Sequence, residues 1–140
     1  MQKNWIYLGA FLDDETRRTL IERYKNEIPE GWKPYFDHAT LAFNNGSDTS
    51  REIFECYKDS LGESIHLCSV AIGRSEEAIA LQLVKAYKTA NDIFHITMAT
   101  APGCKPVRSN FITDWTPLQS YDKINARIGF FANGKINFEL

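Results

Sequence analysis

Two short segments of the sequence place a histidine two residues before a threonine within an apolar run. They are residues 37–43 (DHATLAF) and residues 94–99 (FHITMA). In an extended strand, residues i and i+2 lie on the same face, so each segment would present an imidazole beside a hydroxyl. An imidazole exchanges protons near neutral pH, and a hydroxyl donates hydrogen bonds to anions. The two segments together are therefore typical of a site that acts on an oxyanion.

Two imidazoles and two hydroxyls in one cleft suit the hydrolysis of a phosphodiester. One histidine can take a proton from the attacking water or hydroxyl while the other protonates the leaving oxygen. The hydroxyls can donate to the non-bridging phosphate oxygens, whose charge must be held as the pentacoordinate state forms. We therefore interpret His38 and His95 as a candidate acid–base pair, with Thr40 and Thr97 as candidate phosphate-binding groups. Which histidine is the acid and which the base stays open.

The two segments resemble a known pair of motifs. Residues 38–41 (HATL) and 95–98 (HITM) are similar to the paired H-x-T/S-hydrophobic motifs of the 2H phosphoesterase superfamily, which includes 2′-5′ RNA ligase-like proteins and cyclic phosphodiesterases. The loop at residues 99–110 (ATAPGCKPVRSN) is similar to that of the RNA-repair-like branch, which includes the cyclic phosphodiesterase domains of fungal and plant tRNA ligases.

This resemblance implies a fold, an activity and a set of site residues. The fold would be α+β and bilobal, with two antiparallel sheets facing a central groove and helices packed outside. The activity would be metal-independent attack on a nucleotide 2′,3′-cyclic phosphate or a related 2′-linked phosphodiester. By motif position, the same two histidines and two threonines would form the site.

The loop after the second motif carries further candidates for substrate binding. Lys105 and Arg108 are candidates to contact phosphate, with a solvated basic loop as the alternative. Ser109 and Asn110 are hydrogen-bonding candidates in the same loop.

Aromatic residues near the motifs are candidates to stack a base. Phe36 would lie on the same strand face as His38, although packing in the core is the alternative interpretation. Tyr35 and Trp115 are lesser candidates for the same role.

Other reactive residue types lack a supporting pattern. His66 has no threonine partner, so we expect it to be structural or on the surface. Asp37 would point away from His38, so neither a metal site nor a cofactor is predicted. The three cysteines, an odd number without a CxxC pair, favour reduced structural thiols; they are Cys56, Cys68 and Cys104.

Composition places the chain among soluble globular proteins. It has 140 residues, 44% of them hydrophobic and 24% charged, and we expect one domain over residues 1–140. No apolar run approaches the roughly 20 residues of a membrane span, so we expect a cytoplasmic protein that binds no membrane. We also expect a monomer. The net charge of −2 argues against binding to long duplex nucleic acid. The expected partner is a small nucleotide or an RNA end that carries a cyclic phosphate.

The pattern of elements predicts an α+β domain with antiparallel pairing. Helical patterns follow capping residues at 13–14 and at 49–50, and Asn133-Gly134 indicates a tight hairpin. Residues 79–87 fit either a strand or a helix, and we favour a strand paired with its predecessor. The predicted strands cover residues 4–11, 35–43, 65–72, 79–87 and 93–99, and the helices 13–26 and 49–62.

Two other functions remain compatible with the sequence. The same chemistry could act on a cyclic di- or oligonucleotide signal, as phage-encoded enzymes with these motifs do against bacterial defence. Alternatively, the chain could be a module that binds a nucleotide or RNA end without turning it over. A panel of substrates would separate these possibilities.

Overall fold

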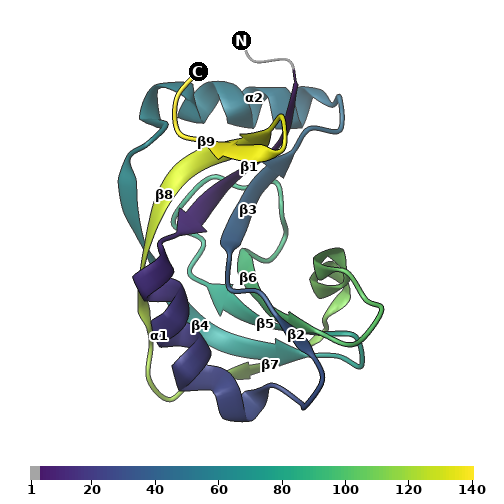
Figure 1. Ribbon diagram of the computed structural model, residues 1–140. Helices are drawn as coiled ribbons and strands as arrows, with labels where there is room; N and C mark the ends of the chain where they lie inside the picture. Colours follow the sequence, from purple (N-terminus) through teal and green to yellow (C-terminus); the bar gives the residue numbers. More distant parts are fainter. Residues whose placement is uncertain (1–3) are drawn as a thin grey trace.

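A computed structural model describes residues 4–140, which form an α+β fold of antiparallel strands with two α-helices (Figure 1). The elements are β1 (Trp5–Leu12), α1 (Asp14–Tyr24), β2 (Lys33–Pro34), β3 (His38–Phe43), α2 (Asp48–Tyr57), β4 (Ser64–Arg74), β5 (Ala78–Leu83), β6 (His95–Thr100), β7 (Asp114–Pro117), β8 (Lys123–Ala132) and β9 (Lys135–Asn137). Short 3₁₀ turns η1 (Lys25–Glu27), η2 (Lys58–Ser60) and η3 (Pro106–Phe111) join some of them.

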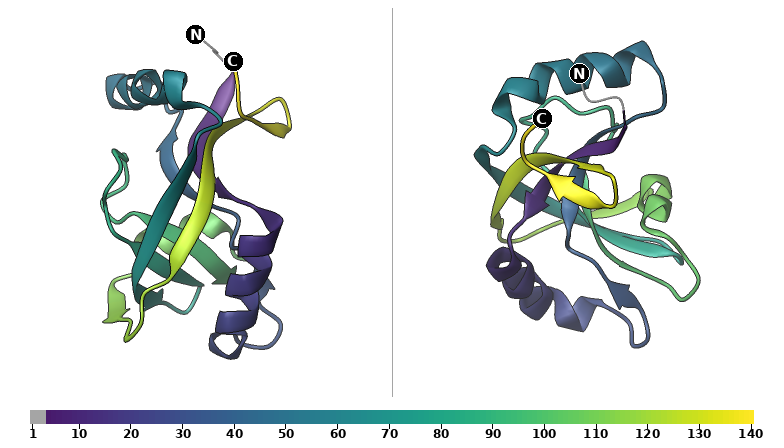
Figure 2. Two further views of the ribbon diagram at one scale, coloured as in Figure 1. Left: turned by 90° about the vertical axis from the view of Figure 1, so that its left-hand side faces the viewer. Right: turned by 45° about the horizontal axis from the view of Figure 1, so that its top comes forward.

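The strands belong to one hydrogen-bonded sheet in the order β7-β4-β5-β6-β3-β1-β8-β9, with β2 added at β6. The first half of the long strand β4 pairs with β8 and the second half pairs with β5 and β7. These pairings close β4, β5, β6, β3, β1 and β8 into a ring. The expected α+β class is confirmed, whereas the expected division into two separate sheets is not shown. The two helices lie at opposite ends of the molecule (Figure 2).

Side-chain caps explain where both helices begin. The Asp13 carboxylate accepts a hydrogen bond from the backbone N–H of Thr16 at 2.7 Å, and the Ser47 hydroxyl accepts one from Ser50 at 3.1 Å. Such caps satisfy backbone donors that have no partner inside the helix. The helix start predicted at residues 13–14 is confirmed. The second helix starts at Asp48, slightly before the predicted residues 49–50.

The predicted hairpins are also confirmed. Strand β5 pairs antiparallel with β4, which settles residues 79–87 in favour of a strand for their first part. Asn133 and Gly134 both have positive φ, 54° and 76°, and join β8 to β9. Two positive φ angles are what the two-residue turn predicted for an Asn-Gly pair requires. The short edge strands β2 and β7 were not predicted.

The strand predicted over residues 35–43 is wrong in its first part. Phe36 has a φ of 52°, a left-handed value that interrupts an extended chain, and β3 begins only at His38. The Phe36 side chain is fully buried and packs near the Tyr24 ring. The backbone N–H of Phe36 donates to the carbonyl oxygen of Thr97 at 3.0 Å, which accounts for the local bend toward β6.

Each motif strand carries a bulge at the residue after its threonine. The pairing of β3 with β1 skips Leu41, and the pairing of β6 with β5 skips Met98; both side chains are fully buried. A bulge shifts the alternation of faces by one residue. Phe43 therefore turns to the side of Thr40, contrary to the predicted alternation, and Ala42 is buried.

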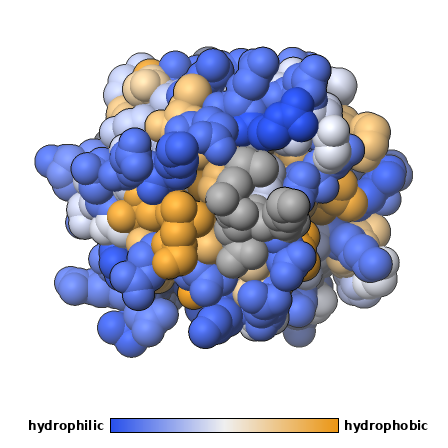
Figure 3. All heavy atoms as spheres, turned by 90° about the horizontal axis from the view of Figure 1, so that it is seen from above, coloured by the Kyte–Doolittle hydropathy of each residue, from blue (hydrophilic) through white to orange (hydrophobic). Residues whose placement is uncertain are grey.

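No helix within residues 4–140 has the length and apolar character needed to cross a bilayer. The face that carries α2 is mainly hydrophilic with small apolar patches (Figure 3).

Candidate active site

The two motif strands meet at the middle residue of each motif. Ala39 of β3 pairs antiparallel with Ile96 of β6, and both side chains are fully buried. The neighbours of this pair point the opposite way, because successive residues of a strand alternate in direction. The histidines and threonines therefore lie together on the other side of the sheet from these two core residues.

Because the two strands are antiparallel, each histidine faces the threonine of the other motif. If the register of the Ala39 pair is continued by one residue in each direction, His38 lies opposite Thr97, and Thr40 lies opposite His95. Each histidine is thus set against the threonine of the other motif. Side chains directly opposite on antiparallel strands are close neighbours.

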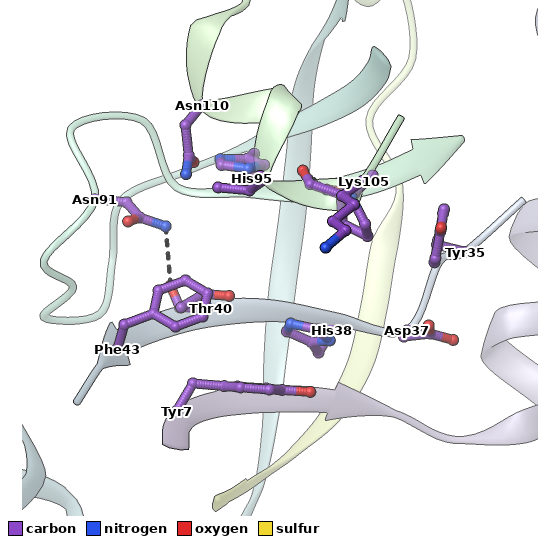
Figure 4. Close-up of a pocket in the computed structure, with 13 residues that line it drawn as sticks. Tyr7, Tyr35, Asp37, His38, Thr40, Phe43, Asn91, His95, Lys105 and Asn110 are labelled. Atoms are coloured by element: carbon purple, nitrogen blue, oxygen red, sulfur yellow. Dashed lines mark hydrogen bonds between the residues drawn. The ribbon is translucent and has the colours of Figure 1, made fainter. Parts of the chain in front are cut away.

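All four of these side chains line one cavity of about 400 Å³ (Figure 4). A cavity of this size falls in the range of small-ligand sites. The remaining lining residues are Tyr7, Tyr35, Asp37, Phe43, Asn91, Lys105, Pro106, Val107 and Asn110. The structure therefore brings the two histidines and two threonines together around one cavity, as the sequence predicted.

His38 is seated among aromatic rings from β1. Its imidazole stacks on Tyr7 with ring centroids 4.7 Å apart, and Phe11 lies 5.4 Å away. Gly9, between these two aromatics, lets β1 lie close to β3. A Cβ at this position would lie 3.1 Å from the carbonyl oxygen of Ala39 and 3.5 Å from the His38 ring. Burial lowers the pKa of His38 to about 4, and repulsion from His95 contributes in the same direction.

His95 is oriented by a backbone hydrogen bond. Its Nδ1 lies 2.8 Å from the carbonyl oxygen of Ile93. Because a carbonyl only accepts, Nδ1 carries the proton, and Nε2 of the neutral ring is left with a free lone pair. Burial lowers the pKa of His95 below its ordinary value, and the Ile93 carbonyl opposes this shift. Any proton that His95 exchanges with a ligand therefore passes through Nε2.

Thr97 is held by the turn that follows its strand. Its hydroxyl lies 2.8 Å from the hydroxyl of Ser109 and 3.4 Å from the carbonyl oxygen of Pro106. Ser109 is buried in η3 and lies outside the lining of the 400 Å³ cavity. Ser109 lines an adjoining cavity instead, and its hydroxyl helps to position Thr97. Its predicted hydrogen bond to substrate stays a prediction.

Thr40 is fixed through its backbone. The hydroxyl of Thr89 and the side-chain amide of Asn91 donate to the Thr40 carbonyl oxygen at 3.1 and 3.5 Å (Figure 4). Among residues 4–140, the Thr40 hydroxyl has no hydrogen-bond partner. This hydroxyl can therefore donate to a ligand in the cavity.

The two predicted loop cations have different surroundings. Lys105 lines the cavity together with Asn110, where both could reach a ligand; their contact with substrate stays a prediction. Arg108 instead donates to the Glu77 carboxylate at 2.7 Å and lies over the Phe111 ring. Arg108 does not line the cavity, and its predicted contact with phosphate stays a prediction.

The aromatic predictions are corrected in the same way. Phe36 is fully buried in the core and presents no surface to a ligand. Tyr35, the lesser candidate, does line the cavity, with Lys33 lying 5.2 Å from its ring centre. Trp115 lines an adjoining cavity rather than this one.

Several residues of the cavity were not predicted as site residues. Tyr7 comes from β1, Phe43 from the far side of the β3 bulge, and Asn91 from the loop before β6. Asp37, predicted to point away, lines the rim, where the Arg17 guanidinium lies 3.1 Å from its carboxylate. Burial raises the pKa of Asp37, and Arg17 opposes that rise.

The other histidine and the three cysteines lie outside the cavity. His66 is exposed on β4, opposite Asn125, which agrees with a surface role. The three cysteines are free thiols, as predicted. Among the described residues, no group of three or more histidine, cysteine, aspartate or glutamate side chains is placed to hold a metal ion.

Of the comparisons with known proteins, the one with solved structures finds a match, and this match shows the fold alone. No protein-family model matches the chain, and no curated protein matches it. Among solved structures, the crystal structure of a fungal RNA kinase superposes with a TM-score of 0.61 at 12% sequence identity. The match covers 91% of this chain and 46% of that chain, so this chain spans less than half the length of the kinase structure.

Proposed function

We propose that this chain is a metal-independent phosphoesterase that hydrolyses a nucleotide 2′,3′-cyclic phosphate or a related 2′-linked phosphodiester. The observation that carries the proposal is the Ala39–Ile96 pair, which sets two histidines and two threonines around one cavity. Two proton-transfer groups and two hydroxyl donors are the parts that such a reaction needs.

The reaction proceeds by in-line displacement at phosphorus. A water oxygen forms the new P–O bond while a neutral imidazole accepts one of the water protons. The bond from phosphorus to the ribose 2′ or 3′ oxygen breaks, and the other, protonated imidazole donates its proton to that oxygen. The hydroxyls of Thr40 and Thr97, with the Lys105 ammonium, stabilise the negative charge on the non-bridging oxygens.

We assign the chain to the 2H phosphoesterase type, in its RNA-repair-like branch. The motifs of β3 and β6 support this, and so does the shared fold with a fungal RNA kinase. In the proposed bilobal description, β1, β3 and β8 form one half of the sheet and β4, β5 and β6 form the other. Each half contributes one motif strand to the cavity.

A substrate panel with identification of products tests the proposal. The panel contains nucleoside 2′,3′-cyclic phosphates, 2′-5′-linked dinucleotides and cyclic dinucleotides. We expect hydrolysis in the first two groups, and the position of the product phosphate then identifies the leaving oxygen and so the roles of the two histidines. Hydrolysis of cyclic dinucleotides alone would favour a signal phosphodiesterase instead. Binding without any product would indicate a module that only holds nucleotides.

The pH dependence follows from the burial of the two imidazoles. The reaction needs one neutral and one protonated ring, a form that exists between the two titration steps of the pair. Burial lowers the pKa of His38 to about 4 and holds that of His95 below its ordinary value. We therefore expect kcat/KM to peak on the acid side of about pH 6.5, the ordinary histidine pKa, rather than at neutrality.

Both limbs of this profile have a defined cause. Above the upper step both rings are neutral and the acid is lost; below the lower step both are charged and the base is lost. A bound phosphodiester anion raises the pKa of a nearby imidazolium, so the kcat optimum should lie at higher pH than the kcat/KM optimum. A kcat/KM that keeps rising from pH 7 to pH 8 would contradict this account.

A further inference from the structure

A second cavity adjoins the first on the far side of His95. It has a volume of about 320 Å³ and is lined by β6, by the loop before it, by η3 and by residues after η3 that include Trp115 of β7. His95, Asn91 and Asn110 line both cavities and so lie where the two adjoin. The reaction described above uses only the first cavity and leaves the second without a role.

The second cavity is lined in part by the indole ring of Trp115, whose position is fixed by close contacts. Trp115 of β7 lies directly on Gly73 of β4: a Cβ at Gly73 would come within 2.5 Å of the indole atom Cε3. The indole N–H donates to the carbonyl oxygen of Ile112 at 3.2 Å. The indole is therefore packed against the Gly73 backbone and held through its N–H, and the half-buried ring lines the cavity.

The charges around the second cavity differ from those of the first. The first is lined by Lys105, whereas no lysine or arginine is among the described residues that line the second, which has Asp92 instead. A carboxylate beside the cavity disfavours a phosphate there. The amides of Asn91 and Asn110 offer both donors and acceptors, which suits the edge of a base or the hydroxyls of a ribose.

We infer that the second cavity is a subsite for an uncharged nucleoside, whose base stacks on Trp115 while the phosphate lies between the two histidines. The inference rests on the proposed function and narrows its substrate class to molecules with a second nucleoside joined through phosphate. A flat aromatic surface binds any base through its π face, and neighbouring amides add selectivity.

The test compares one-nucleoside and two-nucleoside substrates. Trp115→Ala is expected to lower kcat/KM about ten- to a hundred-fold on a 2′-5′-linked dinucleotide or on a dinucleotide that ends in a 2′,3′-cyclic phosphate, the loss of one base–aromatic stack. The loss on a nucleoside 2′,3′-cyclic phosphate should be far smaller. The two dinucleotides distinguish a second nucleoside on the leaving side from one on the 5′ side of the cyclic nucleotide.

Two companion variants separate stacking from folding. Trp115→Phe keeps a π face and should recover most of the dinucleotide activity, whereas Trp115→Leu keeps an apolar contact with Gly73 and should not. Tyr121→Ala serves as the control, because Tyr121 is 65% exposed and lines neither of the two cavities. Equal losses on both substrate classes would mean that Trp115 is only structural and would overturn the inference.

Binding measurements keep the inference testable if no substrate is hydrolysed. That result would defeat the proposed function but not the subsite. The wild-type chain should still bind a dinucleotide more tightly than a mononucleotide, and Trp115→Leu should remove the difference. Equal affinities for the two ligands in the wild-type chain would reject the subsite.

Discussion

His38→Gln and His95→Gln are each expected to lower kcat about 10²- to 10⁴-fold, the usual contribution of one proton-transfer group. Glutamine keeps a polar side chain of similar size but cannot exchange a proton near neutral pH. At position 95 the change also removes the Nδ1 donor to the Ile93 carbonyl, which now orients the imidazole. The loss should appear in kcat under saturating substrate, because the groups act on the bond that breaks rather than on ground-state binding.

A matched control separates chemistry from folding in this test. His66→Gln makes the same substitution at an exposed position on β4 and should leave kcat within a factor of about two, as surface substitutions usually do. Thermal unfolding of all three variants would check that the fold is retained. If either His38→Gln or His95→Gln kept a tenth or more of wild-type kcat, the acid–base pair would be misassigned.

Thr97→Val is expected to have the second-largest effect, a loss in kcat of about 10²- to 10³-fold, comparable to removal of one donor from an anion-binding site. Valine matches threonine in shape but has a methyl group where the hydroxyl stood. It leaves the phosphate short of one hydrogen bond and Ser109 without its partner at 2.8 Å. Thr40→Val should cause a loss of similar size, because its hydroxyl is the corresponding donor from β3.

The threonine test has two internal comparisons. Ser109→Ala should reduce kcat less than Thr97→Val does, since Ser109 contacts Thr97 and does not line the cavity that holds the two histidines. Thr100→Val, on the same strand, removes a hydroxyl that donates to the Cys104 carbonyl at 3.0 Å and does not line the cavity. A loss in Thr100→Val as large as that in Thr97→Val would show that the effect is general destabilisation of β6.

Local sequence signals predicted most of the elements because their causes are local. The cap at Asp13 and the Asn133-Gly134 turn each depend on a few neighbouring residues, and both lie where predicted. The ring of strands could not be predicted in the same way. It depends on β4 pairing with both β5 and β8, and β8 lies far along the chain.

The candidate site was predictable where it rests on two-residue spacing. His38 with Thr40, and His95 with Thr97, follow from the alternation of a strand before any bulge intervenes. Beyond each threonine the bulge changes the alternation, which is why Phe43 was assigned to the wrong face.

Residues that reach the site through long-range pairing left no signal in the sequence. Tyr7 meets His38 only because β1 pairs with β3, and that register cannot be inferred from either strand alone. The ion pair of Arg108 was not predictable for a related reason. Its partner Glu77 lies just before β5, and nothing in the local pattern indicates that this carboxylate takes up the guanidinium.

Hydrolysis of a nucleoside 2′,3′-cyclic phosphate in excess EDTA tests the central claim most directly. The chain would be dialysed against the chelator and assayed in its presence, and then assayed again with added Mg²⁺, Mn²⁺ or Zn²⁺. Because two histidines carry both proton transfers, we predict the same rate of product formation in EDTA as in its absence, with no stimulation by the ions. Activity that is lost in EDTA and restored by a divalent ion would contradict the two-histidine mechanism.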